Sequence, residues 1–307
     1  MVKNSALTSL AILVPITLLL WGTEYTLVGA IDAQVISEAW QVVVRMVFAA
    51  LLMVGFVYMR GDRLPTLSDT SWLWYGLMGV IGMTIPFYLI AKGYHTGVDS
   101  GLISILIGVN PLFTVVLAHI FIKTEPLTRL KTIGFIIGFI GICILFLPEK
   151  ISWAIVENWQ AQALIILAAF GYSLTSILGK RAPEKSASVG AAIMLIGGAI
   201  SAVIGALVFA SAEIPRVMPD TQSLASLIAL TLGATFFGNI LYLTLLQKSG
   251  PSLIAKMMYI VPIIAIISGM IFLGEAFKPR YLISLLIIFA GLWIARQGEI
   301  KRETRVA

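Results

Sequence analysis

The sequence predicts an all-α integral membrane protein of ten transmembrane helices, arranged as two inverted five-helix repeats. Hydrophobic residues make up 59% of the 307 residues and charged residues only 12%. The apolar residues come in ten long blocks, and landmarks of the first half recur in the second. A typical soluble domain carries about 25% charged residues. A soluble fold of this length would therefore lack the charge to cover its surface.

The ten blocks are each long enough to cross a bilayer. Breaking the chain at charged, Pro-rich or polar stretches leaves residues 9–31, 37–59, 72–91, 101–122, 131–147, 160–179, 188–211, 224–246, 252–274 and 280–296. A span needs roughly 17–25 apolar residues, and it must be helical because unpaired backbone groups cannot face lipid. The first block follows Lys3 as in a signal peptide but continues past Trp21, so we expect a retained helix. The connections are too short for a soluble domain.

Basic residues give the chain an orientation. Of its 21 Lys and Arg, 14 fall in the loops that are cytoplasmic if the N-terminus is cytoplasmic, 5 fall in outer loops, and Arg45 and Lys256 lie within spans. The inner set is Lys3, Arg60, Arg63, Lys123, Arg129, Lys131, Lys180, Arg181, Lys185, Lys248, Arg296, Lys301, Arg302 and Arg305. This bias predicts that both termini are cytoplasmic. The net charge of +6 thus reflects orientation signals, and we expect the lipid bilayer, and no nucleic acid, as a partner.

The two halves, residues 1–150 and 151–307, repeat the same landmarks. Matching pairs are Pro111 and Pro262, Glu125 and Glu275, Gly141 and Gly291, Gly79 and Gly233, Tyr88 and Tyr242, and Trp21-Gly22 and Phe170-Gly171. Five helices per half is an odd number, so the second half enters the membrane from the opposite side. Inverted repeats are typical of secondary transporters, in which one half rocks against the other around a site near the midplane.

The Trp21-Gly22 pair and the repeated block of proline, helix, glutamate and glycine-bearing helix resemble the EamA family of the drug/metabolite transporter superfamily. Within it the chain is most similar to bacterial exporters of amino acids, including aromatic ones. The resemblance implies a bacterial inner-membrane protein and a basket of helices around a central cavity. The first four helices of each half would line the cavity, and the fifth, at 131–147 and 280–296, would pack outside it.

Several functional classes are excluded by residues the chain lacks. It has no G-x-x-x-x-G-K-[ST] loop, so transport would depend on a gradient. Its histidines, His95 and His119, fall on opposite sides of the membrane, which prevents a catalytic set such as H-E-x-x-H. The single cysteine, Cys143, excludes a Cys-based metal site. We therefore expect no enzymatic activity, no metal and no cofactor.

Glu24 and Arg45 are the most informative polar residues. An ionisable group within a span usually faces a cavity or a partner. Both fall roughly 10–12 Å below the outer surface at 1.5 Å per helical residue, so they can pair. The pair can be structural, or it can bind substrate or protons. In the related small multidrug exporters a first-helix glutamate takes protons and cationic drugs, but Glu24 lies near the outer end of its span.

A second group is aromatic and amide. Each member lies several residues inside its block, whereas belt aromatics lie at the ends: Trp21, Tyr88, Asn110, Tyr172, Asn239, Tyr242 and Tyr259. Buried hydroxyls and amides need partners, which a water-filled cavity supplies. We expect these residues to line a substrate cavity; interhelical hydrogen bonding is the alternative.

Three prolines inside spans, Pro86, Pro111 and Pro262, remove intrahelical hydrogen bonds and are predicted hinges. The G-x-x-x-G of Gly134 and Gly138 predicts close packing inside the protein. Taken together, the sequence predicts a secondary exporter of amino acids or similar small metabolites that works by alternating access as a monomer. The alternative is a proton-coupled exporter of cationic drugs that uses Glu24.

Overall fold

The computed structural model describes residues 2–32, 34–95, 100–146, 159–215, 217–272, 274 and 277–306. The proposed junction between halves at residue 150 and the repeat glutamate Glu275 lie outside them. Ten helical stretches of the described chain are long and apolar enough to cross a membrane. The predicted ten-helix fold is confirmed.

In the first half, span 1 consists of α1 (Val2–Gly22) and α2 (Glu24–Gly29), and span 2 is α3 (Glu38–Met59). Span 3 is α4 (Ser71–Gly79), the π-helical η1 (Val80–Thr84) and α5 (Ile85–His95). Span 4 consists of α6 (Ser100–Ile107) and α7 (Asn110–Phe121), and span 5 is α8 (Arg129–Phe146).

In the second half, span 6 is α10 (Trp159–Arg181) and span 7 is α11 (Ala187–Phe209), followed by the short 3-10 turn η2 (Ser211–Glu213). Span 8 is α12 (Thr221–Leu230), the π-helical η3 (Thr231–Phe237) and α13 (Gly238–Ser249). Span 9 is α14 (Pro251–Phe272), and span 10 is α15 (Pro279–Val306).

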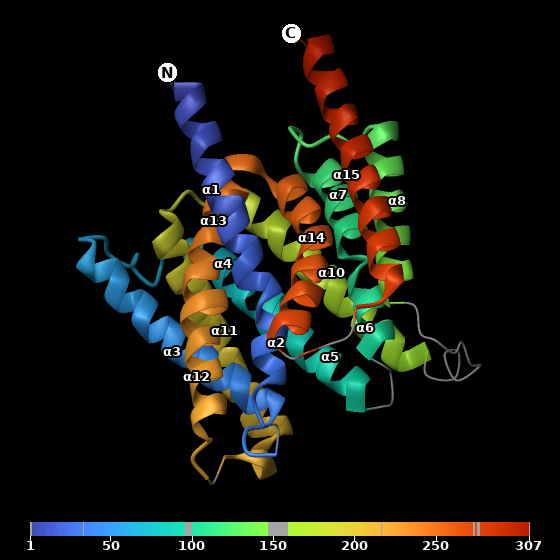
Figure 1. The fold of residues 1–307 in the computed structure, drawn as a ribbon. Coiled ribbons are helices and arrows are strands. Elements are labelled where there is room, and N and C mark those ends of the chain that lie inside the picture. The colour runs from blue at the N-terminus through green and yellow to red at the C-terminus, as the bar shows by residue number, and fades with distance from the viewer. Residues whose placement is uncertain are drawn as a thin grey trace.

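The helices of the two halves interleave in a repeat-related pattern. Span 1 packs on spans 8 and 9, and span 6 packs on the equivalent spans 3 and 4. Spans 2 and 7 pack together, as do spans 5 and 10. Both ends of the chain lie at the same end of the bundle (Figure 1). This agrees with an even number of crossings, so the odd number of spans in each half inverts the second half relative to the first.

Glycines allow a close contact between α8 and α15. The backbone atoms of Gly134 and Gly138 on α8 lie against Gly291 of α15, and a Cβ on Gly291 would lie only 2.6 Å from Gly134 O and from Gly138 N. The two helices run side by side at one edge of the bundle (Figure 1). The G-x-x-x-G therefore packs within the protein, as predicted.

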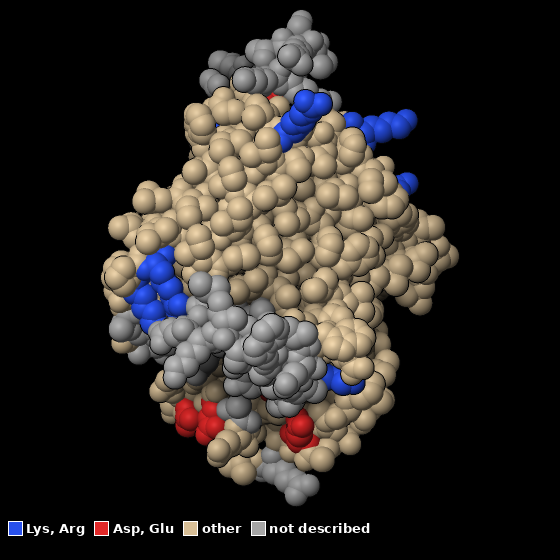
Figure 2. Space-filling view, turned by 90° about the vertical axis from the view of Figure 1, so that its right-hand side faces the viewer, with Lys and Arg blue, Asp and Glu red and all other residues tan. Residues whose placement is uncertain are grey.

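The surface is apolar where lipid would cover it. Exposed large hydrophobic residues include Leu51, Ile204 and Leu286, from spans in both halves. Figure 2 shows a broad face without Lys, Arg, Asp or Glu between basic residues toward the top and charged residues of both signs toward the bottom. In water such a surface would be unfavourable, whereas in a bilayer it is solvated by lipid.

Two π-helical segments interrupt spans 3 and 8, which are equivalent in the repeat. When the halves are aligned with the offset of 154 residues that relates Gly79 to Gly233, η1 corresponds to the end of η3. π-helical turns are rare and are found frequently at functional sites. The hydrophobic periodicity of spans 3 and 8 gives no local sign of these turns.

Candidate transport site

Glu24 and Arg45 form an ion pair between spans 1 and 2. Nη2 of Arg45 lies 2.5 Å from Oε1 of Glu24. The Arg45 side chain is 6% exposed and that of Glu24 is 26% exposed. The carboxylate is therefore the more accessible partner of a pair that lies inside the bundle.

The break in span 1 places Glu24. The helix α1 ends at Gly22, Thr23 forms a turn, and Glu24 is the first residue of α2. Gly22 packs directly on Ile264 of α14, where a side chain would have no room. The Trp-Gly pair thus has a structural reason, since the glycine lets span 1 approach span 9 closely just before Glu24.

Thr235, from the second half, is the third member of this site. Its Oγ1 accepts hydrogen bonds from Nε of Arg45 at 3.2 Å and from Nη2 at 3.1 Å. Thr235 is not among the site residues predicted from the sequence. A signal was available: Thr231, Thr235 and Asn239 recur every four residues, which predicts one polar face on a helix, and all three are buried.

Three of the predicted aromatic and amide residues lie on the two spans that supply Glu24 and Thr235, with Trp21 on span 1 and Asn239 and Tyr242 on span 8. The Trp21 and Tyr242 rings have centroids 6.1 Å apart, and the Tyr242 hydroxyl lies 3.3 Å from Ser176 Oγ. Nδ2 of Asn239 donates to the Thr235 carbonyl at 2.6 Å. Asn239 thus bonds the backbone of its own span, at the residue whose hydroxyl binds Arg45.

Asn110 and Tyr172 lie at the contact of spans 4 and 6. Ser173 of α10 donates to the Asn110 carbonyl at 3.0 Å, and Asn110 Oδ1 accepts from Thr114 at 3.2 Å. Tyr172 is half-buried next to Ser173. The bond between Ser173 and Asn110 joins α7 to α10, and a role of Asn110 and Tyr172 in lining a cavity stays a prediction.

Tyr88 and Tyr259 lie in helix–helix interfaces. The Tyr88 hydroxyl donates to the Ala202 carbonyl at 3.2 Å, and its ring packs on Gly205 of α11. Tyr259 is fully buried, and its hydroxyl donates to the Phe135 carbonyl at 2.8 Å. Both make the interhelical hydrogen bonds that the sequence offered as the alternative to lining.

The three prolines occupy different local settings. Pro86 follows η1 as the second residue of α5, and Pro111 lies in the first turn of α7, just after the break at Gly108 and Val109. Pro262 lies inside the continuous helix α14. Pro86 and Pro111 thus lie at irregularities of their spans. Near the start of a helix the backbone N–H that proline lacks has no intrahelical partner in any case, so the proline costs fewer hydrogen bonds there.

A second polar cluster joins the halves at the end of the bundle predicted to be cytoplasmic. We call Glu125, Lys131, Ser252, Lys256 and Glu299 the Lys131 network. Lys131 Nζ lies 3.2 Å from Glu125 Oε2 and 2.5 Å from Ser252 Oγ, and Ser252 also bonds Glu125. Lys256 pairs with Glu299 at 2.7 Å, so its ammonium has a carboxylate partner. The network lines a hollow of about 270 Å³.

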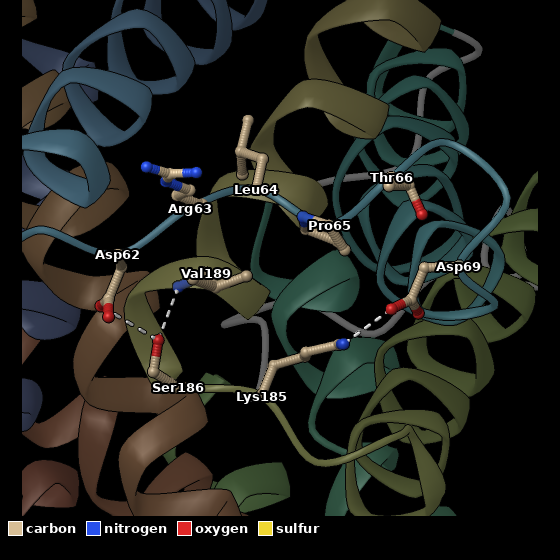
Figure 3. Close-up of a pocket in the computed structure, with 9 residues that line it drawn as sticks. All are labelled: Asp62, Arg63, Leu64, Pro65, Thr66, Asp69, Lys185, Ser186 and Val189. Atoms are coloured by element: carbon tan, nitrogen blue, oxygen red, sulfur yellow. Dashed lines mark hydrogen bonds and ion pairs between the residues drawn. The ribbon is translucent and has the colours of Figure 1, made fainter.

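A hollow of about 520 Å³ lies between the loop after α3 and the start of α11 (Figure 3). Asp69 accepts from Lys185 Nζ at 2.7 Å across it, again between the halves. The hydrogen bond from Lys185, followed by that from the Ser71 N–H, lowers the pKa of Asp69 to about 2. Ser186 caps the N-terminus of α11 and lies near Asp62.

The ten-span bundle, built from two inverted halves, has the architecture typical of secondary transporters. The sequence matches the EamA-like transporter family over residues 8–147 and 159–297. The chain belongs to this family, and it is a transporter and not an enzyme. Each match covers five spans, in agreement with the two-repeat architecture.

Individual relatives agree with this assignment. The inner membrane transporter YedA of Escherichia coli is 24% identical over 89% of this chain and 86% of its own length. A probable amino-acid metabolite efflux pump of Salmonella typhimurium is 24% identical over 83% and 86%. A solved crystal structure superposes with a TM-score of 0.77 at 18% identity, over 94% of this chain and 97% of the other. At that identity, the superposition supports the fold alone.

Proposed function

We propose that the protein exports amino acids, including aromatic ones, or similar small zwitterionic metabolites by alternating access. The observation that carries the proposal is the ion pair of Glu24 and Arg45, held from the second half by Thr235. A zwitterion carries an ammonium and a carboxylate, and the pair offers a carboxylate and a guanidinium to match them. When the ammonium of the zwitterion binds Glu24 and its carboxylate binds Arg45, every charge keeps a partner of opposite sign.

The surroundings of the pair suit an organic side chain. The rings of Trp21 and Tyr242 pack together and supply aromatic surface. Trp21 lies shortly before Glu24 in the sequence, and Tyr242 lies shortly after Asn239 on α13. Binding sites for small molecules are mostly apolar with a few placed polar groups. Export, as the direction, is supported by the printed name of the Salmonella relative, a probable amino-acid metabolite efflux pump.

The second candidate is a proton-coupled exporter of cationic drugs. It is favoured by one observation, the greater exposure of Glu24 (26%) compared with Arg45 (6%). A cation would bind the carboxylate in place of Arg45 and leave a buried guanidinium without its charge partner, which is unfavourable. The zwitterion satisfies both groups and is the stronger candidate.

We also propose a location, an oligomeric state and a motion for the protein. The protein lies in a bacterial inner membrane as a monomer with both termini cytoplasmic, and halves 1–150 and 151–307 rock against each other. Pro86, Pro111 and Pro262 act as hinges, and Tyr88, Asn110, Tyr172 and Tyr259 join Trp21, Asn239 and Tyr242 along the substrate path in at least one state. The E. coli relative YedA, named an inner membrane transporter, supports the location.

Counterflow in proteoliposomes tests the function. Purified protein is loaded with an unlabelled amino acid, and uptake of the labelled amino acid is followed with and without a pH gradient. We expect saturable uptake that internal substrate stimulates, and its loss in Glu24→Gln and Arg45→Gln. Uptake of a cationic dye in response to the pH gradient, with no amino-acid counterflow, would favour the second candidate. An unchanged rate in Glu24→Gln would remove Glu24 from the site.

A further inference from the structure

The Thr235 hydroxyl has no hydrogen-bonding capacity to spare. A hydroxyl offers one donor and two acceptor sites. Oγ1 lies 3.0 Å from the Leu230 carbonyl, which can only accept, so Thr235 donates its proton there. Its lone pairs then accept from Nε and Nη2 of Arg45. The residue is 2% exposed, so its hydroxyl is directed at Arg45 and is closed to other ligands.

The π-helical turn is what aims this hydroxyl. Thr231 and Thr244, on the same span, bond the carbonyls four residues earlier, those of Leu227 and Ile240. Thr235 bonds the carbonyl five residues earlier, because η3 is wound as a π-helix. The wider turn places Thr235 against α3, and turns of this kind are found frequently at functional sites.

The two bonds fix the plane of the Arg45 guanidinium. Its five N–H groups form a rigid planar fork. Thr235 holds Nε and Nη2, and Glu24 binds Nη2. The hydrogen bonds that Arg45 makes within the described residues thus engage one side of the fork and leave Nη1.

We infer that Thr235 is a positioning residue for Arg45, which it holds so that the guanidinium can receive a carboxylate of the transported molecule. The inference rests on the proposed function, because it requires Arg45 to contact the cargo. Thr235 belongs to the second half, whereas Glu24 and Arg45 belong to the first. Movement of one half against the other therefore reorients the carboxylate-binding group, which links cargo recognition to the transport cycle.

Three variants test the inference. Thr235→Val keeps the side-chain size and removes the hydroxyl, Thr235→Ser keeps the hydroxyl, and Thr244→Val removes a hydroxyl that bonds only its own helix. The probes are L-phenylalanine and L-phenylalaninamide, which keeps the ammonium and the ring but lacks the carboxylate. We expect Thr235→Val to raise the KM for L-phenylalanine about tenfold, since bonds to a charged group are lost. The KM for the amide should change less than twofold, and Thr235→Ser and Thr244→Val should resemble the wild type.

An equal rise in KM for both probes, or equal damage by Thr235→Ser, would overturn the positioning role. A double-mutant cycle in thermal unfolding, with Thr235→Val and Glu24→Gln, separates this failure from failure of the proposed function. If Thr235 acts through Arg45, the Tm shift of Thr235→Val should change by at least about half in the Glu24→Gln background. Additive shifts would refute positioning. If the Tm shifts of the two variants are coupled but the wild-type protein transports neither probe, the amino-acid function alone is refuted.

Discussion

Replacing Gly291 with alanine should destabilise the contact between the fifth helices of the two halves. The added Cβ would lie 2.6 Å from Gly134 O and 2.6 Å from Gly138 N, whereas ordinary contacts of a Cβ begin near 3.4 Å. Both obstructing atoms belong to the backbone, so no side-chain rotation can relieve the clash. The helices α8 and α15 must separate by several tenths of an ångström along their shared face.

Overpacking of this kind costs about 1–3 kcal/mol. Since about 1 kcal/mol lowers the Tm of a chain of 150–250 residues by roughly 2–4 °C, a fall of several degrees is expected for Gly291→Ala. The assay is thermal unfolding in detergent with a thiol-reactive dye. The reporter is Cys143, the only cysteine in the sequence and a half-buried residue of α8.

The matched control is Gly55→Ala in α3. A Cβ there meets nothing within 4 Å, and replacing glycine by alanine inside a helix is worth roughly 0.5–1 kcal/mol in favour of alanine. Gly55→Ala should therefore leave the Tm unchanged or raise it slightly. Equal melting temperatures for Gly291→Ala and the wild type would show that the close approach of α8 and α15 is not the contact described here.

Three further predictions concern the Lys131 network, a proposed hinge, and the partly exposed ion pair of Asp69 and Lys185. Lys131→Met should destabilise the protein by about 3–5 kcal/mol because it leaves Glu125 without its buried partner. Lys256→Met breaks a partly exposed pair and should cost less than about 1 kcal/mol. Equal Tm shifts for the two variants would contradict the burial argument. Pro111→Ala restores a backbone N–H at the break between α6 and α7, so in counterflow assays it should slow transport more than it weakens substrate binding; the reverse outcome would count against hinging. The pKa of Asp69 is lowered from 3.8 in the unfolded chain to about 2 in the folded protein, so the pair with Lys185 stabilises the fold above about pH 4 and loses its effect as the pH falls toward about 2. The Tm difference between wild type and Asp69→Asn should therefore shrink over that interval, and a difference that stays constant down to about pH 2 would disprove the linkage.

Much of the architecture could be predicted because membrane insertion depends on local and additive properties. The ten blocks read from hydrophobicity agree with the ten spans, since the bilayer selects any segment that is long and apolar enough. The ion pair of Glu24 and Arg45 could also be anticipated, because two charges at similar depths on consecutive helices have few other partners. The EamA family assignment rests on the same kind of linear evidence.

Side-chain partners depended on how the helices rotate and cross, which hydrophobicity does not encode. In a span apolar on all sides, the sequence does not tell which face meets another helix. The sequence therefore left open whether Tyr259 and Tyr88 line a cavity or bond another helix, and the structure places them against Gly138 and Gly205. Likewise, only the tertiary structure brought Ser252 to Lys131 from the other half of the chain.

The sequence by itself determined the class, the number of spans, the repeat and the charged pair. The tertiary structure decided that Thr235 completes that pair, because a π-helical turn changes which side of span 8 faces span 2. Such a turn follows from the balance of packing across several helices, so no local pattern announces it. The polar site is consequently shared between the halves, although both of its charges belong to the first.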